Sequence, residues 1–261
     1  MIYWKLFKIK NKMNYKEFDN ISCYEEFEIQ SSLMGISKVD ILRNIGYKID
    51  NYYFFVSDDG IFNWFDIEGN HVQEPRVLEK IISINIPKTI IKCVIPNGVI
   101  SIDDCTFYEC NSLKEITIPD TVTSIGEYAF YHCKSLKEII IPDSVISIGD
   151  KAFRYCTSLT SITIPNSIRS IGDGTFYNCK SLKEITIPDS VINIECEAFS
   201  GCESLESITI PDSVTHIGGG AFFDCNSLKE IIFKGKTLDE VERMWNYPFG
   251  IEDENVFKVE T

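Results

Sequence analysis

Six cysteines of this 261-residue chain recur at every twenty-third position, and this strict interval constrains the fold more than any other feature. They are Cys110, Cys133, Cys156, Cys179, Cys202 and Cys225. The residues between them repeat too, in the pattern Cys-x-Ser-Leu-x-x-Ile-x-Ile-Pro-x-x-Val-x-x-Ile-Gly-x-x-Ala-Phe. A fixed period of this length is typical of solenoids, in which each repeat is one coil that buries its apolar face only against neighbouring coils. The sequence therefore predicts a stack of coils.

One coil is too small to fold alone. Leu113, Ile116 and Ile118 alternate as in a strand, Pro119 withholds a further backbone donor, and Phe130 lies where the chain turns back inward. Burying about five large apolar side chains contributes roughly 8 to 15 kcal/mol, whereas ordering the backbone costs on the order of 1 to 2 kcal/mol per residue. Stability must therefore grow with the number of stacked coils, and the terminal coils need caps.

The strand positions of the repeat can be counted along the chain. They fall at Cys93, Ile116, Ile139, Ile162, Ile185, Ile208 and Ile231. This spacing predicts seven coils and a sheet about 29 Å long, from six steps of about 4.8 Å. The Ile-Pro pair at Ile86-Pro87 is out of phase with this frame, so we expect residues 77 to 96 to form an irregular first coil.

The repeat resembles the BspA-like, treponemal class of leucine-rich repeats, whose hallmark is Leu-x-x-Ile-x-Ile-Pro followed by Ile-Gly-x-x-Ala-Phe. Successive copies run from Leu136 to Phe153, Leu159 to Phe176, Leu182 to Phe199 and Leu205 to Phe222. Departures are small: Thr106 and Thr175 replace the alanine, Asp103 and Glu195 replace the glycine, and Cys93 replaces the first strand isoleucine. The resemblance implies a right-handed solenoid used for adhesion or protein recognition, with no catalysis by the repeat itself. The end of the chain is similar to closing segments of leucine-rich repeat proteins encoded by gut bacteria and their phages.

The expected fold is therefore a repeat solenoid, a right-handed leucine-rich repeat stack of about seven 23-residue coils with a small α+β N-terminal domain and a helical C-terminal cap. Residues 1–76 lack the period: Leu33 to Ile45 predicts a helix ending at Gly46, and Tyr52 to Val56 with Ile61 to Ile67 predicts a hairpin. Residues 68–70 predict another turn, and residues 77–234 the solenoid.

Residues 235–261 predict a C-terminal capping segment. Thr237 to Glu240 has the pattern of a capping box, with Thr237 as N-cap and Glu240 reaching back. Leu238, Val241, Met244 and Trp245 predict one apolar helix face. Residues 246–250 predict a turn, and residues 256–259 a last strand.

Charge and hydropathy exclude some classes of partner. The net charge of −14 argues against nucleic-acid binding, which needs clustered Lys and Arg. No run approaches the 18 apolar residues needed to cross a bilayer, so we expect no membrane insertion. Lys5 and Lys8 interrupt the apolar start, and no export signal is evident. We expect a cytoplasmic protein, or one released in a particle or by lysis.

The cysteines predict packing rather than disulfides. Side chains of stacked coils run parallel about 4.8 Å apart, whereas a disulfide needs β-carbons about 3.8 Å apart and directed toward each other. We therefore expect a ladder of reduced, buried thiols at the six repeat positions, joined by an inward Cys93. Cys105 and Cys196 fall at positions expected to be exposed. The paired short spacings of a zinc site are not present.

Catalytic motifs are missing as well. The three histidines are His71, His132 and His216, the last two at expected loop positions. No His-Glu-x-x-His, phosphate-binding glycine loop or Gly-x-Ser-x-Gly occurs. We predict no catalytic, cofactor-binding or metal-binding residues. An enzyme within the N-terminal domain, using Cys23 and His71, stays an alternative.

Functional residues should be those that the coil itself does not need, and the outward strand positions are the main candidates. These positions are Lys114, Glu115, Thr117, Lys137, Glu138, Ile140, Thr160, Thr163, Lys183, Glu184, Thr186, Glu206, Thr209, Lys229 and Glu230. They predict a lysine column beside a glutamate column. The face is either a solvated surface whose opposite charges offset one another, or a docking surface for a partner, which is a protein or, as a second option, a glycan.

Two further columns each allow two interpretations. Asp120, Asp143, Asn166, Asp189 and Asp212 follow the prolines and either bond the backbone N–H two residues on or form a calcium ladder. Tyr108, Tyr131, Tyr177 and Phe223 either pack between coils or stack on a glycan.

The leading hypothesis is a non-enzymatic recognition protein that binds a partner through the strand face. The alternative is a structural component of a larger assembly, such as a virion or surface layer, docked by the N-terminal domain.

Overall fold

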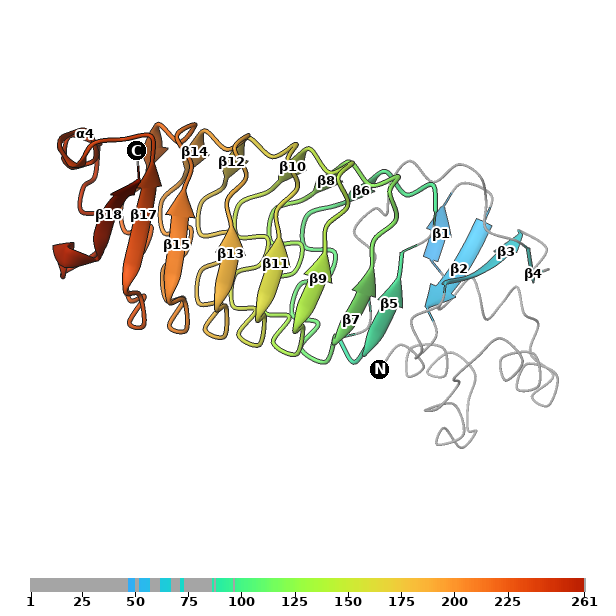
Figure 1. Cartoon of the computed structure of the whole chain (residues 1–261). Coiled ribbons are helices and arrows are strands. Elements are labelled where there is room, and N and C mark those ends of the chain that lie inside the picture. The colour runs from blue at the N-terminus through green and yellow to red at the C-terminus, as the bar shows by residue number, and fades with distance from the viewer. Residues whose placement is uncertain are drawn as a thin grey trace.

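The computed structural model shows a solenoid of parallel β-coils (Figure 1). It describes residues 86, 88–95 and 97–260, and the backbone of residues 47–49, 52–56, 62–66 and 71–72. The predicted helix over residues 33–45, residues 77–85 of the expected first coil, and Cys23 lie outside the described residues. Within the described part, every element of the coils is a short strand or a turn, and helix is confined to residues 238–242 and 254–256.

The first side of the solenoid is formed by the seven strands that the repeat predicts. They are β5 (Lys92–Val94), β7 (Glu115–Thr117), β9 (Glu138–Ile140), β11 (Ser161–Thr163), β13 (Glu184–Thr186), β15 (Ser207–Ile210) and β17 (Glu230–Lys234). Each of these strands contains its predicted strand position, and Ile162 pairs in parallel register with Ile139 and Ile185. An eighth strand, β18 (Phe257–Glu260), pairs in parallel with β17, which confirms the expected last strand.

The second side consists of two-residue strands. They are β6 (Ser101–Ile102), β8 (Ser124–Ile125), β10 (Ser147–Ile148), β12 (Ser170–Ile171), β14 (Asn193–Ile194) and β16 (His216–Ile217). They pair in parallel as β6-β8-β10 and β12-β14-β16. His216 therefore lies in a strand, and its expected loop position is wrong.

Turns form the third side, and they are hydrogen-bonded from coil to coil. The Phe107 amide donates to the Ala129 carbonyl at 2.7 Å, and the Phe130 amide donates to the Ala152 carbonyl at 2.7 Å. Each turn contains two left-handed residues, such as Tyr128 (φ 55°) and His132 (φ 60°). A non-glycine residue in this region costs roughly 1 kcal/mol or more, and the sequence carries no consistent glycine to signal these positions.

The core contains two ladders that run through the stack. Phe107, Phe130, Phe153, Phe176, Phe199 and Phe222 stack with ring centroids 5.1 to 5.7 Å apart. Beside them the Cys179 thiol donates to the Phe153 carbonyl of the preceding coil at 3.3 Å. The thiols of Cys133, Cys156, Cys202 and Cys225 make the same bond to a phenylalanine carbonyl at 3.1 to 3.3 Å. The expected thiol ladder is confirmed, and Cys93 is buried while Cys105 and Cys196 are exposed, as expected.

The prediction that each aspartate after proline closes its own turn is wrong. The Val122 amide, two residues beyond Asp120, donates instead to the Pro119 carbonyl at 3.1 Å, and the Val145 amide donates likewise to Pro142. A backbone turn of this kind leaves the carboxylate free to point into solvent. The threonine hydroxyls that replace the repeat alanine are satisfied locally, because Thr106 and Thr175 donate to the carbonyls of Asp103 and Gly172 at 2.8 Å.

The N-terminal strands form a separate antiparallel sheet in the order β1-β2-β3-β4. They are β1 (Tyr47–Ile49), β2 (Tyr52–Val56), β3 (Phe62–Asp66) and β4 (His71–Val72). The antiparallel pairing of β2 with β3 confirms the expected hairpin, and the pairing of β3 with β4 fits a turn at residues 68–70.

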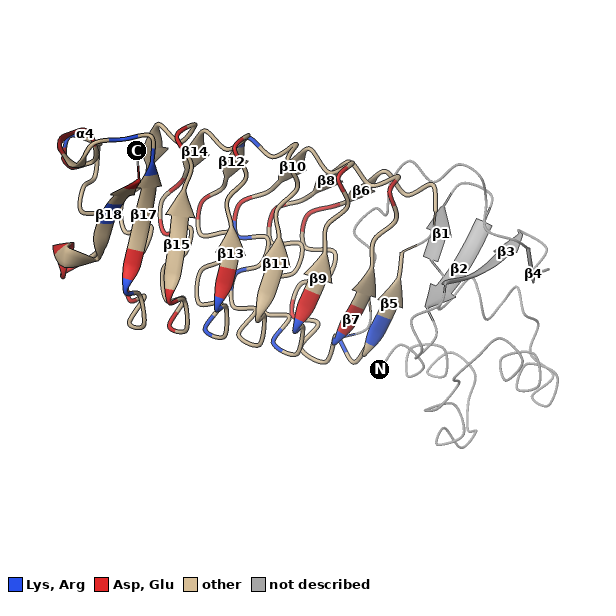
Figure 2. Cartoon of the chain, in the orientation of Figure 1, with Lys and Arg blue, Asp and Glu red and all other residues tan. Residues whose placement is uncertain are grey.

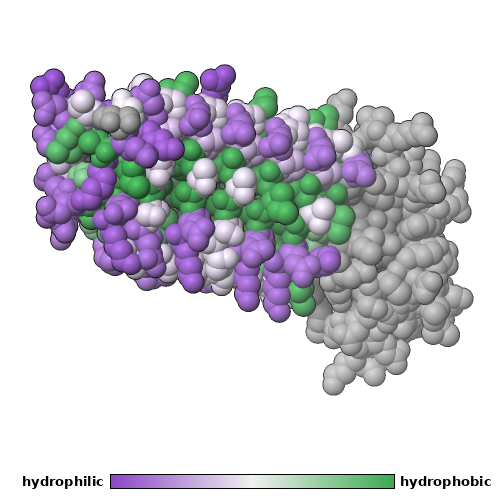
Figure 3. Space-filling model, in the orientation of Figure 1, coloured by the Kyte–Doolittle hydropathy of each residue, from purple (hydrophilic) through white to green (hydrophobic). Residues whose placement is uncertain are grey.

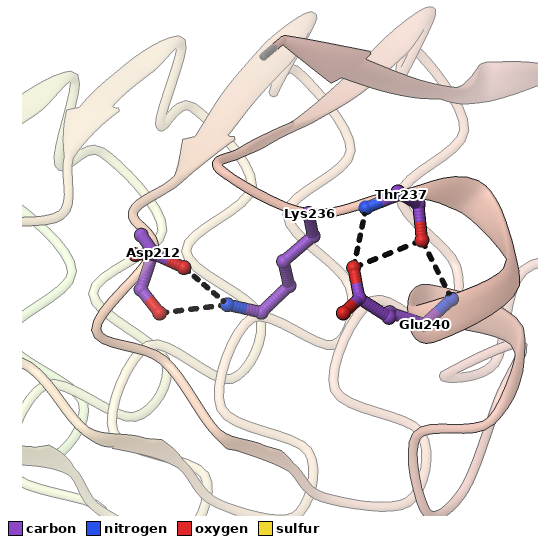
Figure 4. A network of polar contacts seen from close by, with 4 residues as sticks. All are labelled: Asp212, Lys236, Thr237 and Glu240. Atoms are coloured by element: carbon purple, nitrogen blue, oxygen red, sulfur yellow. Dashed lines mark hydrogen bonds and ion pairs between the residues drawn. The ribbon is translucent and has the colours of Figure 1, made fainter.

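At the other end, α4 (Leu238–Glu242) begins with the predicted capping box. Glu240 Oε2 accepts from the Thr237 amide at 2.8 Å, and Lys236 donates to the carbonyl and the carboxylate of Asp212 at 2.7 and 3.2 Å (Figure 4). The expected four-residue apolar face is wrong in part. Val241 is fully buried, but Trp245 and Leu238 are 76% and 44% exposed, because α4 ends at Glu242 before a full second turn is built.

Candidate functional site

The strand face is the outward surface of β5 to β17, and the structure brings the predicted residues together there. Parallel pairing in steps of one repeat sets Thr163 beside Ile140 and Thr186, and sets Ser161 beside Glu138 and Glu184. The preceding positions, from Lys114 to Lys229, lie directly before each strand. Because side chains alternate along a strand, Ile139 and Ile162 are buried between these exposed residues.

The charged columns are interrupted, as Figure 2 shows. Glutamate begins β7, β9, β13 and β17, whereas serine begins β11 and β15. In the column before the strands, Thr160 and Glu206 stand where the pattern would place lysine. The centre of the face is therefore an uncharged patch at Thr160, Ser161 and Thr163. The Thr160 hydroxyl donates a hydrogen bond to the Lys137 carbonyl at 3.1 Å.

Ion pairs form at the two ends of the strand face. Lys92 lies 2.9 Å from Glu115, and Lys229 lies 2.7 Å from Glu206. The Lys229 ammonium lowers the pKa of the Glu206 carboxyl by hydrogen bonding and attraction. Both pairs connect neighbouring coils along a column. In the described part of the chain, the charged groups of Lys114, Lys137 and Lys183 make no ion pair within 4.0 Å.

A hydrophobic band runs along the strand face between hydrophilic rows (Figure 3). Ile140 is its most exposed large apolar residue at 80%, and Val94 is 39% exposed at the same register position of the first coil. Thr117, Thr163 and Thr186 continue this column with exposed side chains. The face thus exposes Ile140 in a column that is largely threonine, beside lysines that make no ion pair with the described residues.

Lys92 and Val94 belong to the strand face, and sequence reasoning missed them. Because an irregular first coil was expected over residues 77 to 96, these two residues were not included in the predicted strand face. They lie one full repeat before Glu115 and Thr117, so the period itself was the signal that could have found them.

The aromatic residues of the turn side pack against each other, which supports the inter-coil interpretation. Tyr108 stacks on Tyr131 with centroids 4.7 Å apart. The column then changes, because Arg154 occupies the next position and places its guanidinium 3.7 Å from the Tyr177 ring centroid. Phe223, expected in this column, is 51% exposed. Neighbouring side chains of the protein therefore cover a face of the Tyr108, Tyr131 and Tyr177 rings.

The described residues offer little for chemistry. They contain no group of three or more His, Cys, Asp or Glu placed to hold a metal ion. Burial raises the pKa of the Cys110 thiol to about 11 and of the Cys225 thiol to about 12. Thiols with raised pKa are poor nucleophiles at neutral pH. Burial and the nearby Lys134 lower the pKa of His132.

The repeat region matches the family described as "BspA type Leucine rich repeat region" in six copies, over residues 83–203 and 146–245. The chain belongs to this BspA-type leucine-rich repeat family. Among proteins with curated functions, none matches it. In the part of this BspA-type protein that the structure describes, no helix has the length and apolar character to span a bilayer.

Solved structures of bacterial leucine-rich repeat proteins resemble this BspA-type protein. A leucine-rich repeat protein from T. pallidum is 22% identical, with 81% of this chain and 99% of that one covered and a TM-score of 0.51, and it shares the fold. A leucine-rich cell surface protein from Faecalibacterium prausnitzii is 26% identical, with 60% and 63% covered and a TM-score of 0.41. A leucine-rich repeat protein from Bacteroides ovatus is 25% identical, with 72% and 70% covered and a TM-score of 0.43. The chain spans 63% of the length of the F. prausnitzii protein.

Proposed function

We propose that this BspA-type protein is a non-enzymatic recognition module that binds a protein partner through its strand face. The observation that carries the proposal is Ile140, which is 80% exposed on the strand face, beside lysines that make no ion pair in the described part of the chain. Protein interfaces combine a buried apolar centre with a polar rim. Binding of a protein at this face would bury the Ile140 side chain and give the lysines ion-pair partners.

A protein fits this face better than a glycan or a nucleic acid. The outward positions of β5 to β17 carry no aromatic residue on which a sugar ring could stack. The face has six lysines, from Lys92 to Lys234, and five glutamates, from Glu115 to Glu230, so its charges nearly balance and it lacks the positive field that a phosphate backbone requires. Mixed charges in fixed register favour a partner with its own mixed pattern.

The proposal also assigns a role to each segment of the chain and a cellular location to the protein. Residues 77–234 form the recognition solenoid, with the right-handed coil of the family. Residues 1–76 and 235–261 cover its two ends, the latter through α4 and the buried Val241. The ladder of buried thiols supports residence in a reducing cytoplasm, or release from it in a particle or by lysis.

Site-specific photocrosslinking tests the proposed face. A photoreactive amino acid at Ile140 should crosslink one protein partner in extract from the source cells. The same group at Ile146, which is 64% exposed beside the second side, should not. Equal crosslinking from both positions would refute a specific strand face.

Charge reversal provides the second test. Changing Lys114, Lys137 and Lys183 together to Glu should abolish the Ile140 crosslink. The melting curve should change little, because exposed charges contribute little to stability. Matched single variants sharpen the result: Lys137→Glu should weaken the crosslink, whereas Arg169→Glu, at an exposed site before β12, should leave it unchanged. The assembly alternative predicts the opposite, with a crosslink that is indifferent to all three lysines and is lost on deletion of residues 1–76.

A further inference from the structure

The C-terminal end of the solenoid, where α4 lies near β18, exposes three large apolar side chains, which we call the end patch. Its residues are Trp245, Leu238 and Val259, which are 76%, 44% and 40% exposed. β18 is the last strand in the order β15-β17-β18, and no described strand pairs with its outer edge. Figure 1 shows α4 and β18 together at this end, and Figure 3 shows hydrophobic surface there between hydrophilic residues. An unpaired edge beside exposed apolar side chains is a typical site for another chain to bind.

The surroundings of the end patch are strongly acidic. Between Thr237 and Glu260 the chain has seven acidic and two basic side chains, which is a net charge of −5. The acidic residues, all exposed, are Asp239, Glu240, Glu242, Glu252, Asp253, Glu254 and Glu260. A partner for this end must therefore be both apolar and basic. Two such ends would repel each other, so pairing of β18 with β18 of another copy is disfavoured.

The chain itself contains a segment with that chemistry. Residues 1–16 carry five lysines and no acidic residue, a net charge of +5. Large apolar residues, including Trp4, Phe7 and Ile9, alternate with these lysines. The segment complements the end patch in charge and apolar character.

We propose that residues 1–16 of one copy dock on the end patch of a second copy, so that the protein assembles head to tail. A second copy is favoured over the same chain, because the β5 and β18 ends of the stack are about 34 Å apart, from seven steps of about 4.8 Å. Spanning that length within one chain would order many additional residues at about 1 to 2 kcal/mol each. A head-to-tail contact joins two different surfaces, so it produces rings or open chains.

The mass of the full-length protein in solution tests the proposal. Sedimentation at low salt should show a mass that rises with concentration beyond two copies. At about 0.5 M salt the mass should fall to that of one copy, because exposed charges are screened within a few ångströms. A single-copy mass under all these conditions overturns the proposal, and so does a salt-independent dimer.

A charge swap identifies the two surfaces. The double variants Lys5→Glu with Lys8→Glu, and Glu242→Lys with Glu252→Lys, should each raise the concentration for assembly by about tenfold or more. Mixing the two double variants should restore a two-copy complex, because the unchanged segment of one variant then meets the unchanged end patch of the other. Failure of the mixture to assemble, or unchanged assembly of either variant alone, overturns the proposal.

The apolar part of the contact has its own control. Trp245→Ser should weaken assembly, whereas Ile146→Ser, at a comparably exposed isoleucine far from the end patch, should not. Circular dichroism of both variants should match the parent protein. Equal effects of the two substitutions would show that general surface hydrophobicity, not the end patch, causes the association.

Discussion

A β-carbon on Gly149 would lie 2.5 Å from the backbone nitrogen of Glu127 in the preceding coil. Gly126 and Gly218 are in the same position, since their added β-carbons would lie 2.5 and 2.3 Å from backbone nitrogens of the coil before. None of these three glycines has a left-handed φ. At these three positions glycine is therefore favoured by the close approach of adjacent coils, not by the backbone conformation, whereas Asp103 and Glu195 occupy the same position in two other coils.

Gly149→Ala should lower the free energy of unfolding by about 1 to 3 kcal/mol or more, because the coils must separate to admit the methyl group. Gly219→Ala is the matched control. Its β-carbon would come no closer than 3.8 Å to Asn246, so the change should be below about 0.5 kcal/mol. Denaturant unfolding of both variants measures the difference, and equal losses would refute the steric explanation.

Ile162→Ala should cost roughly 2 to 5 kcal/mol, because it leaves a cavity in the middle of the stack. Ile162 is only 6% exposed, whereas the next residue, Thr163, points outward and is exposed. Thr163→Ala should therefore change the free energy of unfolding by less than about 0.5 kcal/mol. Urea melts of the two variants decide the matter, and similar losses would contradict the inward and outward assignment.

Thiol labelling of the native protein should separate the cysteines into two groups. Cys196 and Cys105 are exposed, whereas Cys93 and the repeat cysteines are buried. Cys105 should react more slowly than its exposure suggests, because partial burial and the neighbouring Asp104 and Glu127 raise the pKa of its thiol. Intact mass after a timed pulse of iodoacetamide measures this order. Early labelling of Cys156 or Cys179 would show that the ladder opens readily.

Stability should fall as the pH rises above about 9. Burial raises the pKa of the Cys156 thiol well above its ordinary value of 9.0, so the unfolded chain loses this proton at a pH where the folded chain keeps it. The stabilisation is complete below pH 9 and is lost as the pH rises toward the folded pKa, by about 1.4 kcal/mol per pH unit for each such thiol.

Comparison with Cys156→Ala isolates one thiol. Between pH 8 and pH 10.5, the variant should lose about 2 kcal/mol less free energy of unfolding than the parent protein, both in reductant. Urea unfolding at the two pH values provides the measurement. An identical loss in both proteins would show that this thiol does not contribute to the alkaline transition.

The period made most of the fold predictable. Because one strand isoleucine recurs at the same position of every repeat, the parallel register of the strands follows from the sequence alone, and the pairings of β11 with β9 and β13 and of β15 with β17 obey it. The thiol ladder followed from the same period and the geometry of disulfides. The outward residues of the strand face could be named for the same reason, although the irregular first coil concealed Lys92 and Val94.

Other features depended on contacts that a one-dimensional pattern does not contain. The sequence around Asp120 is typical of a turn closed by the side chain, but the Val122 amide donates to the Pro119 carbonyl instead. Arg154 interrupts the aromatic column, and its contact with the Tyr177 ring exists only when the coils are stacked. Trp245 looked like a core residue by helical spacing, yet α4 stops too early to turn it inward.

The sequence by itself determined the coil, its register and the identity of the buried ladders, because each repeat can bury its apolar side chains only against identical neighbours. The tertiary structure decided which outward charges meet, as in Lys229 with Glu206, and which make no ion pair among the described residues, as in Lys137. It also decided that the end of the stack leaves Trp245 exposed, and that among the described strands β18 pairs only with β17. Those outcomes depend on distances between coils and on where the stack ends. A repeat pattern does not specify either, because it is the same in every coil.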